Sequence, residues 1–226
     1  MLQHICGKIS YVHRDRGETG REWFRITRNA DGSRTLRATC ELDDEGILRD
    51  VVHTVGSDWK PVDSFVRLHS GGVFAGSSWF HFSDTTLACE ADLADVGRIS
   101  QSIAVPQRPD VFAAHPLSSD GWQVSQFDHS REATRQEILS SHCSPRADGG
   151  SGPLAGVNPK ALEFLGNEVR SVPAGSFDTR HFLIHTPRDD WPPLELWVHG
   201  DDNILVELEW PILHSRYILT DLSMSR

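Results

Sequence analysis

The chain has 226 residues, of which 38% are hydrophobic and 24% charged, and its formal net charge is −10. This composition is typical of a folded globular protein, and chains of this length often form one large β domain. An acidic chain without a run of Lys or Arg lacks the positive surface that binds phosphate backbones, so we expect no nucleic-acid partner. No stretch of about 18 apolar residues occurs, so we also expect no insertion into a membrane.

The beginning of the chain, MLQHICGKISYVHRD, contains no apolar segment of the kind found in export signals. The four cysteines, Cys6, Cys40, Cys89 and Cys143, show no CxxC spacing. Cys40 and Cys89 fall within strand-like runs, where a thiol acts as a small hydrophobic group, whereas Cys143 lies in a region that we expect to be exposed. These features predict a cytoplasmic protein with unpaired cysteines.

Residues 5–91 alternate strand-like runs with short turn sequences such as Asn-Ala-Asp-Gly and Gly-Gly. Gaps of this length join antiparallel neighbours in a sheet. In the run 34–42, apolar side chains at the even positions alternate with polar ones from Arg37 to Glu41, which is the period of a strand with one buried face. The run 73–82 differs, because large apolar side chains occupy both of its faces.

The middle of the chain predicts one more strand at 98–105 and then a loop at 106–122 that contains several prolines. Because this loop also carries Phe112, His115 and Trp122, we expect it to be a lid over a cavity rather than a disordered segment.

Residues 130–142 predict the helix of this protein, because Ser130 can cap its first turn and the interior residues favour helix. Residues 146–159 are rich in Gly, Pro and Ser and predict a flexible connector. On its far side, Pro159 predicts a short helical turn over 160–166.

The last part of the chain, residues 168–222, predicts four strands separated by Pro- and Gly-containing turns. Alternate positions of these strands are uniformly apolar, and their opposite faces carry His, Glu and Arg. We therefore expect one buried face, which includes Phe182, Ile184, Leu196, Val198, Val206 and Leu208.

Two segments of this region, VRSVPAGSFDTRHFLIH and LELWVHGDDNILVELEW, resemble the ending of bacterial proteins of the domain of unknown function 3108. The resemblance covers about a quarter of the chain. It implies a long curved antiparallel sheet like those of periplasmic lipoprotein carriers, and it implies no particular chemistry. Together with the strand pattern, it predicts an all-β protein: a long antiparallel meander forming an open barrel or half-barrel with one associated α-helix, in a single domain over residues 1–226.

The sequence contains no GxGxxG, GxxxxGK(S/T), HExxH, GxSxG or EF-hand motif. We therefore expect no cofactor and no metal. One metal hypothesis is that His185, His199 and Glu207 converge on a divalent cation from adjacent strands. The alternative is that they are ordinary polar groups that keep an outer sheet face soluble.

Several strands of the first half carry an aromatic, His or Arg side chain on one face at alternate positions. If these faces align, they form a concave ligand-binding surface; the alternative is a solvated outer face. The predicted ligand-binding residues are Trp23, Arg25, His53, Arg67, His69, Trp79 and, from the loop, Trp122.

Three residues are candidates for acid–base catalysis beside such a surface: His81, His115 and Asp120. The alternative for the last two is turn chemistry, since His-Pro and Asp-Gly are common in turns. We expect the protein to bind a hydrophobic or amphipathic small molecule in its concave face. A cofactor-independent lyase, isomerase, hydratase or cyclase that uses the same cavity is the alternative, and a third is an interaction module. A homo-oligomer is compatible with either.

Overall fold

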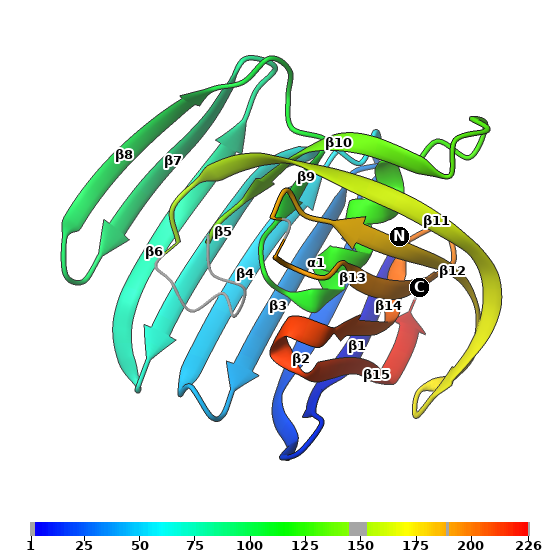
Figure 1. The fold of residues 1–226 in the computed structure, drawn as a ribbon. Coiled ribbons are helices and arrows are strands. Elements are labelled where there is room, and N and C mark those ends of the chain that lie inside the picture. The colour runs from blue at the N-terminus through cyan, green and yellow to red at the C-terminus, as the bar shows by residue number, and fades with distance from the viewer. Residues whose placement is uncertain (1–2, 145–152, 189, 226) are drawn as a thin grey trace.

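The computed structural model describes residues 3–144, 153–188 and 190–225. Within these residues, fifteen strands form one sheet in the order β8-β7-β6-β5-β4-β3-β2-β1-β15-β14-β13-β12-β11-β10-β9 (Figure 1). All neighbours pair antiparallel except β9 and β10, which are parallel. Because the first strand pairs with the last, from His4 with Ser225 to His13 with Ser215, two arms of the sheet meet where the two ends of the chain meet.

The predicted class is confirmed: the protein is an all-β, mostly antiparallel meander that curls into an open, barrel-like sheet (Figure 1). The first arm contains β1 (Gln3–His13), β2 (Gly17–Arg28), β3 (Arg34–Leu42), β4 (Ile47–Val55), β5 (Pro61–Ser70), β6 (Val73–Phe82), β7 (Thr86–Leu93) and β8 (Gly97–Ala104). The second arm contains β9 (Val111–Ala113), β10 (Arg135–His142), β11 (Gly156–Val172), β12 (Gly175–His185), β13 (Leu194–His199), β14 (Ile204–Trp210) and β15 (Ser215–Ser225).

The inner faces of the two arms pack against each other. Phe24 of β2 shares a hydrophobic cluster with Phe182 of β12 and Leu208 of β14, and Phe80 of β6 packs on Phe112 of β9 with ring centroids 5.0 Å apart. The uniform apolar face predicted for the last strands is confirmed, because all six of its side chains are at most 1% exposed. Burying such side chains contributes about 1.5–3 kcal/mol each.

A short α-helix, α1 (Leu117–Asp120), continues into the 3-10 helix η1 (Gly121–Gln126) and lies within the curve of the sheet (Figure 1). Its start is held by Glu22 of β2, whose carboxylate accepts hydrogen bonds from the backbone N–H groups of Leu117 and Ser118 at 2.6 and 3.1 Å. A carboxylate at this end satisfies N–H groups that have no partner within the helix. A second 3-10 helix, η2 (Pro211–Leu213), links β14 to β15.

The helix predicted at 130–142 is wrong, because residues 135–142 form β10. Their exposure alternates as in a strand, with Gln136 and Ile138 buried and Arg135 and Glu137 exposed. Pairing with β9 on one side and β11 on the other outweighs the helix propensity of these residues.

The helical turn predicted at 160–166 is also wrong, since these residues lie within β11. Of the predicted connector, residues 146–152 lie outside the described residues, and 156–159 belong to β11. Pro159 is tolerated there because β11 pairs with β12 only from Ala161 onward, so no ladder hydrogen bond on that side needs its missing N–H.

Candidate functional site

An internal cavity of about 440 Å³ lies between the two arms of the sheet. Residues from β1, β3, β4, α1, η1, β10, β11, β14 and the segments beside them line it, so it exists only when the two arms are assembled. Three exposed charged side chains, Arg16, Glu45 and Arg188, line its outer end, where it reaches the surface.

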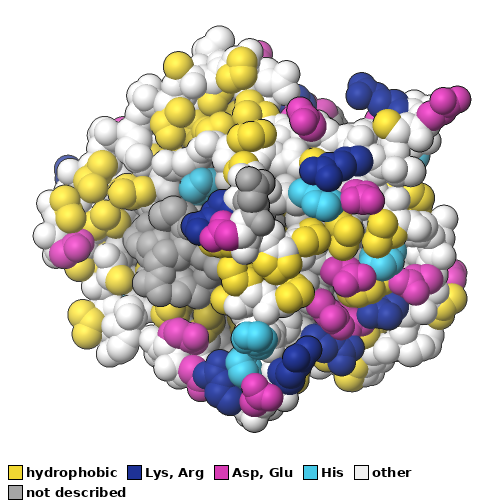
Figure 2. All heavy atoms as spheres, in the orientation of Figure 1, with side chains coloured by type: hydrophobic (Ala, Val, Ile, Leu, Met, Phe, Trp, Pro, Cys, Tyr) yellow, Lys and Arg dark blue, Asp and Glu magenta, His cyan; other side chains and the backbone are white. Residues whose placement is uncertain are grey.

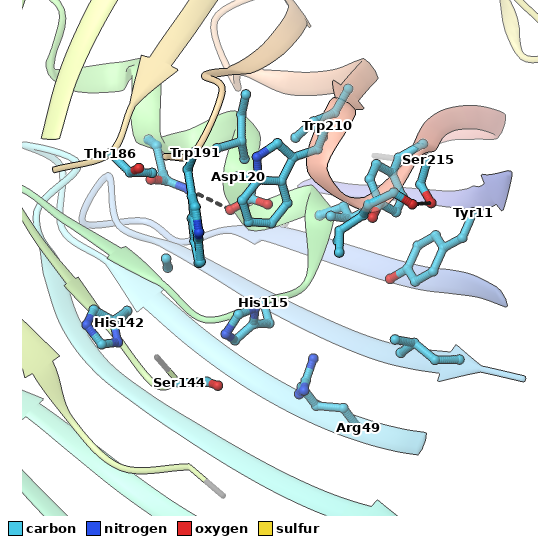
Figure 3. Close-up of a pocket in the computed structure, with 18 of the residues that line it drawn as sticks. Tyr11, Arg49, His115, Asp120, His142, Ser144, Thr186, Trp191, Trp210 and Ser215 are labelled. Carbon is cyan, nitrogen blue, oxygen red and sulfur yellow. Dashed lines mark hydrogen bonds between the residues drawn. The ribbon is translucent and has the colours of Figure 1, made fainter. Parts of the chain in front are cut away.

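One side of the cavity is apolar. Trp191 and Trp210 contact each other edge to face, with ring centroids 5.5 Å apart, and Tyr11 meets Tyr217 in the same manner at 5.2 Å. Leucines from both arms complete this wall: Leu42, Leu117, Leu194, Leu208 and Leu213. Figure 3 shows Trp191 and Trp210 on one side of the cavity, and His115, His142 and Arg49 on the other.

The polar side is organised around Gln123 of η1. Its amide Nε2 donates to Asp120 Oδ1 at 2.5 Å, and its Oε1 accepts from Lys160 Nζ at 2.8 Å. One neutral side chain therefore fixes both an acid from α1 and an amine from β11. All three side chains line the cavity.

Burial shifts the pKa values of both ionisable groups in this trio towards neutrality. It raises the pKa of Asp120 to about 7, which the positive charge of Lys160 partly opposes. It lowers the pKa of Lys160 to about 8, which the negative charge of Asp120 partly opposes. Groups that titrate near neutral pH inside a cavity are typical of functional sites.

His115 is held in a strained backbone conformation, with a φ of 74°. A non-glycine residue in this region costs about 1–3 kcal/mol, and such strain concentrates at functional sites. Burial first, and then the positive charge of Arg49, lower the pKa of His115 well below its usual value, so its ring is neutral. Burial also lowers the pKa of His142.

Four polar atoms at the cavity wall are buried and have no hydrogen-bond partner among the described residues. They are His115 Nε2, His142 Nδ1, Asn158 Oδ1 and Thr186 Oγ1. Buried polar groups in native proteins almost always have a partner, so each unpaired one needs an explanation. Four such atoms line this one cavity.

Of the residues predicted from sequence, the structure brings His115 and Asp120 together in the wall of this cavity. Trp122 is 3% exposed and His53 is 2% exposed, and their rings lie 5.8 Å apart in the core rather than in the cavity wall. From Val111 onward the predicted loop forms β9, α1 and the start of η1 in the interior of the protein, so the lid predicted for it is wrong.

The other predicted residues do not face the cavity. Trp23 and Trp79 are each 44% exposed, and Arg25, Arg67 and His81 are exposed as well, because they lie on the outer face of β2, β5 and β6. Their predicted position on the concave face is wrong. His69 is half-buried and packs on Phe74, with ring centroids 6.0 Å apart.

The residues of the hypothetical metal site have separate partners. His185 Nε2 lies 2.8 Å from Glu163, His199 Nδ1 lies 2.8 Å from the carbonyl of Asp178, and Glu207 pairs with two arginines. No group of three or more potential ligands that could hold a metal ion occurs in the described part of the chain. Over the second arm, Figure 2 shows acidic, basic and His side chains interspersed.

Lys160, Gln123 and the two tryptophans of the apolar wall were not predicted as site residues from the sequence. Lys160 was assigned to a helical turn, which hid its position on an inner strand face. A signal was present in the composition, since the chain has only three lysines among its 22 cationic residues. Trp191 lies in a Pro-containing loop, where no periodicity reports which side is buried, whereas Trp210 belongs to the alternating apolar face of β14 and was expected in the core.

No family model matches the chain, and no curated protein matches it. Among solved structures, it is similar to a β-barrel-like protein of the domain of unknown function DUF1849 from Brucella abortus, with a TM-score of 0.61, 10% identity, and coverage of 99% of this chain and 98% of that chain. This similarity shows a β-barrel-like fold. It does not extend to chemistry at such low identity, and the finer resemblance to domain of unknown function 3108 is not shown.

Two further solved structures match at lower TM-scores. A DUF1089 family protein from Pseudomonas aeruginosa has a TM-score of 0.46 and 12% identity, covering 85% of this chain and 90% of that chain. A protein named "putative lipoprotein" from Parabacteroides distasonis has a TM-score of 0.33 and 11% identity, covering 97% of this chain and 94% of that chain.

The cytoplasmic location expected from the sequence is wrong. The matching solved structures that overturn it carry the names "putative lipoprotein" and "putative exported protein". The first residues of the chain do not decide the location. None of the helices in the described residues is long and apolar enough to cross a membrane.

Proposed function

We propose that the protein binds one amphipathic small molecule in the internal cavity. The observation that carries this proposal is the set of four unpaired polar atoms in a cavity that is also lined by aromatic rings and leucines. A volume of about 440 Å³ is within the range of roughly 300–1,000 Å³ that is common for small-molecule sites.

The two walls define the chemistry of the ligand. Its apolar part packs against Trp191, Trp210 and the leucines, where burial of apolar area favours binding. Its polar end lies against His115, Asn158 and Thr186, which offer both donors and acceptors. The neutral histidine rings can donate or accept a hydrogen bond, and Lys160 supplies a positive charge in the same wall, so the site accepts a carbonyl, hydroxyl or carboxylate group.

A fluorescent fatty-acid probe, 11-(dansylamino)undecanoic acid, tests the proposal. We expect one probe per chain with a micromolar dissociation constant, equivalent to about 8 kcal/mol. Trp191→Ala removes part of the apolar wall from a half-buried position and should weaken binding on the order of tenfold. Trp79→Ala is the matched control, because this tryptophan lies on the outer face.

Unchanged binding in Trp191→Ala together with weakened binding in Trp79→Ala would place the ligand outside the sheet and refute the proposal. Circular dichroism of both variants verifies that the sheet is intact. A complete lack of probe binding by the folded protein would contradict the proposal as well.

The pKa of Asp120, about 7, favours a second candidate function, which is acid–base catalysis on the bound molecule without a cofactor. Lyases, isomerases, hydratases and cyclases all need such a group. The test is exchange of the protons next to the carbonyl of 2-decanone in D₂O, followed by NMR. We expect Asp120→Asn to abolish exchange, and absence of exchange with the unmodified protein would eliminate this candidate for ketones.

A further inference from the structure

The wall of the cavity contains a lysine, Lys160, and lysine is rare in this protein. Of the 22 Lys and Arg residues, only Lys8, Lys60 and Lys160 are lysines. An arginine stays protonated at any physiological pH, so only a lysine can become a neutral amine and attack carbon. Lys160 is thus the one lysine in the cavity wall.

The partners of the three lysines differ. Lys60 forms an ion pair with Asp110, with Nζ 2.9 Å from Oδ1, and Lys8 lies over the ring of Trp23 at 5.8 Å on the outer face. Lys160 Nζ instead donates to the neutral amide oxygen of Gln123. In the described residues, no carboxylate oxygen lies within ion-pair distance of Lys160 Nζ.

This geometry suits a neutral amine. One N–H of such an amine donates to Gln123, and its lone pair is available to the cavity. The lowered pKa of Lys160, about 8, agrees with this arrangement, because a substantial fraction of the amine is then neutral at pH 8. A desolvated lysine in an apolar pocket is an established way to activate this nucleophile.

We propose that Lys160 captures the carbonyl group of an amphipathic aldehyde as an imine. The inference rests on the proposed function, since the apolar wall must hold the alkyl chain while the carbonyl reaches the amine. It specifies the ligand class of that cavity as straight-chain aldehydes.

The step balances without an oxidant or reductant. The lone pair of Lys160 Nζ forms a bond to the carbonyl carbon, and a proton moves from nitrogen to oxygen to give a carbinolamine. The C–O bond then breaks, the nitrogen loses its second proton, and one water is released. The imine remains attached to Lys160. Asp120, fixed by the same Gln123, is the group in this wall that can give a proton to the departing hydroxyl and take one from nitrogen.

The experiment uses decanal with sodium cyanoborohydride at pH 8, which reduces an imine to a stable secondary amine. Intact mass spectrometry should show one decyl group per chain, and peptide mapping should place it on Lys160. We expect its labelling to exceed that of Lys8 and Lys60 on the order of tenfold, because of the three lysines only Lys160 lines the cavity that holds the alkyl chain beside the amine. Decanoic acid, which competes for the cavity, should reduce the labelling.

Two variants sharpen the test. Lys160→Arg keeps the charge and removes the nucleophile, so the specific adduct should vanish, whereas Lys60→Arg should leave it in place. Equal labelling of all three lysines in the unmodified protein would overturn the inference, and this result does not depend on any variant folding.

The same samples separate the two proposals. If the dansyl probe binds and Lys160 is not labelled, imine capture is wrong while ligand binding stands. If the probe does not bind either, both proposals are wrong.

Discussion

Asp120→Asn should make the protein more stable at neutral and alkaline pH. The carboxyl group is buried beside the cavity, and its pKa is raised from 3.8 to about 7, mainly by that burial. Asparagine has nearly the shape of the protonated acid and carries no charge. The substitution therefore removes the cost of holding a buried carboxylate.

The direction and size of the effect follow from the two pKa values. The pKa of Asp120 is higher in the folded than in the unfolded protein, so the folded protein binds this proton more tightly. The resulting contribution to the free energy of unfolding is fully present below pH 3.8 and is lost as the pH rises through about 7. The difference between a pKa of 3.8 and one of about 7 corresponds to about 4 kcal/mol in total, of which about 2–3 kcal/mol falls between pH 5 and pH 8. Lys160, with its lowered pKa, changes the stability mainly above pH 8.

The assay is urea unfolding at several pH values from 5 to 8, followed by tryptophan fluorescence. The free energy of unfolding of Asp120→Asn, relative to the unmodified protein, should increase by about 2–3 kcal/mol over this range. Asp84→Asn, an exposed residue between β6 and β7, controls for loss of one surface charge. Parallel pH profiles for the unmodified protein and Asp120→Asn would refute the argument that burial holds this carboxyl near neutrality.

Two further predictions concern the structure that supports the cavity. Asp202 is 4% exposed and pairs with both Arg28 and Arg34. Asp202→Ala should therefore lower the free energy of unfolding, measured with urea, by about 2–4 kcal/mol. A loss of less than about 0.5 kcal/mol would show that water solvates the two arginines adequately without Asp202. All four cysteines are unpaired and only Cys6 is partly exposed, so a thiol reagent should modify one group in the native protein and four after denaturation; fewer than four would indicate a disulfide.

The fold could be predicted because alternation with period two survives in the sequence wherever one sheet face is buried. The last strands show this clearly, from Phe182 to Leu208. The helix could not be predicted, because α1 depends on Glu22, which is 95 residues from Leu117 in the chain. Conversely, the helix propensity of residues 130–142 is overruled by pairing with strands that are distant in sequence.

The candidate site was predicted only in part for a related reason. Alternation shows which residues share a face, but not which face turns inward. In β6, Phe80 pairs with Ser64 and is fully buried, whereas Trp79 pairs with Phe65, and both of these are more than 40% exposed. Both faces carry aromatic rings, so the sequence of β6 alone does not distinguish them. His115 and Asp120 were predicted as site residues because their loop combined several chemically active side chains.

The burial of the Cys143 thiol could not be predicted from the sequence either. Cys143 was expected to be exposed. It is 1% exposed, because the end of β10 lies against the inner face of the first arm, in the cluster that contains Phe80 and Phe112.

A crystal structure of the protein with decanoic acid would show whether the internal cavity holds a single amphipathic molecule. We expect one molecule between the two arms, with its alkyl chain against Trp191 and Trp210 and its polar end within hydrogen-bond distance of His115 Nε2 or Lys160 Nζ. Electron density for the ligand on the outer face beside Trp23 and Trp79, with the cavity filled only by water, would refute binding in the cavity.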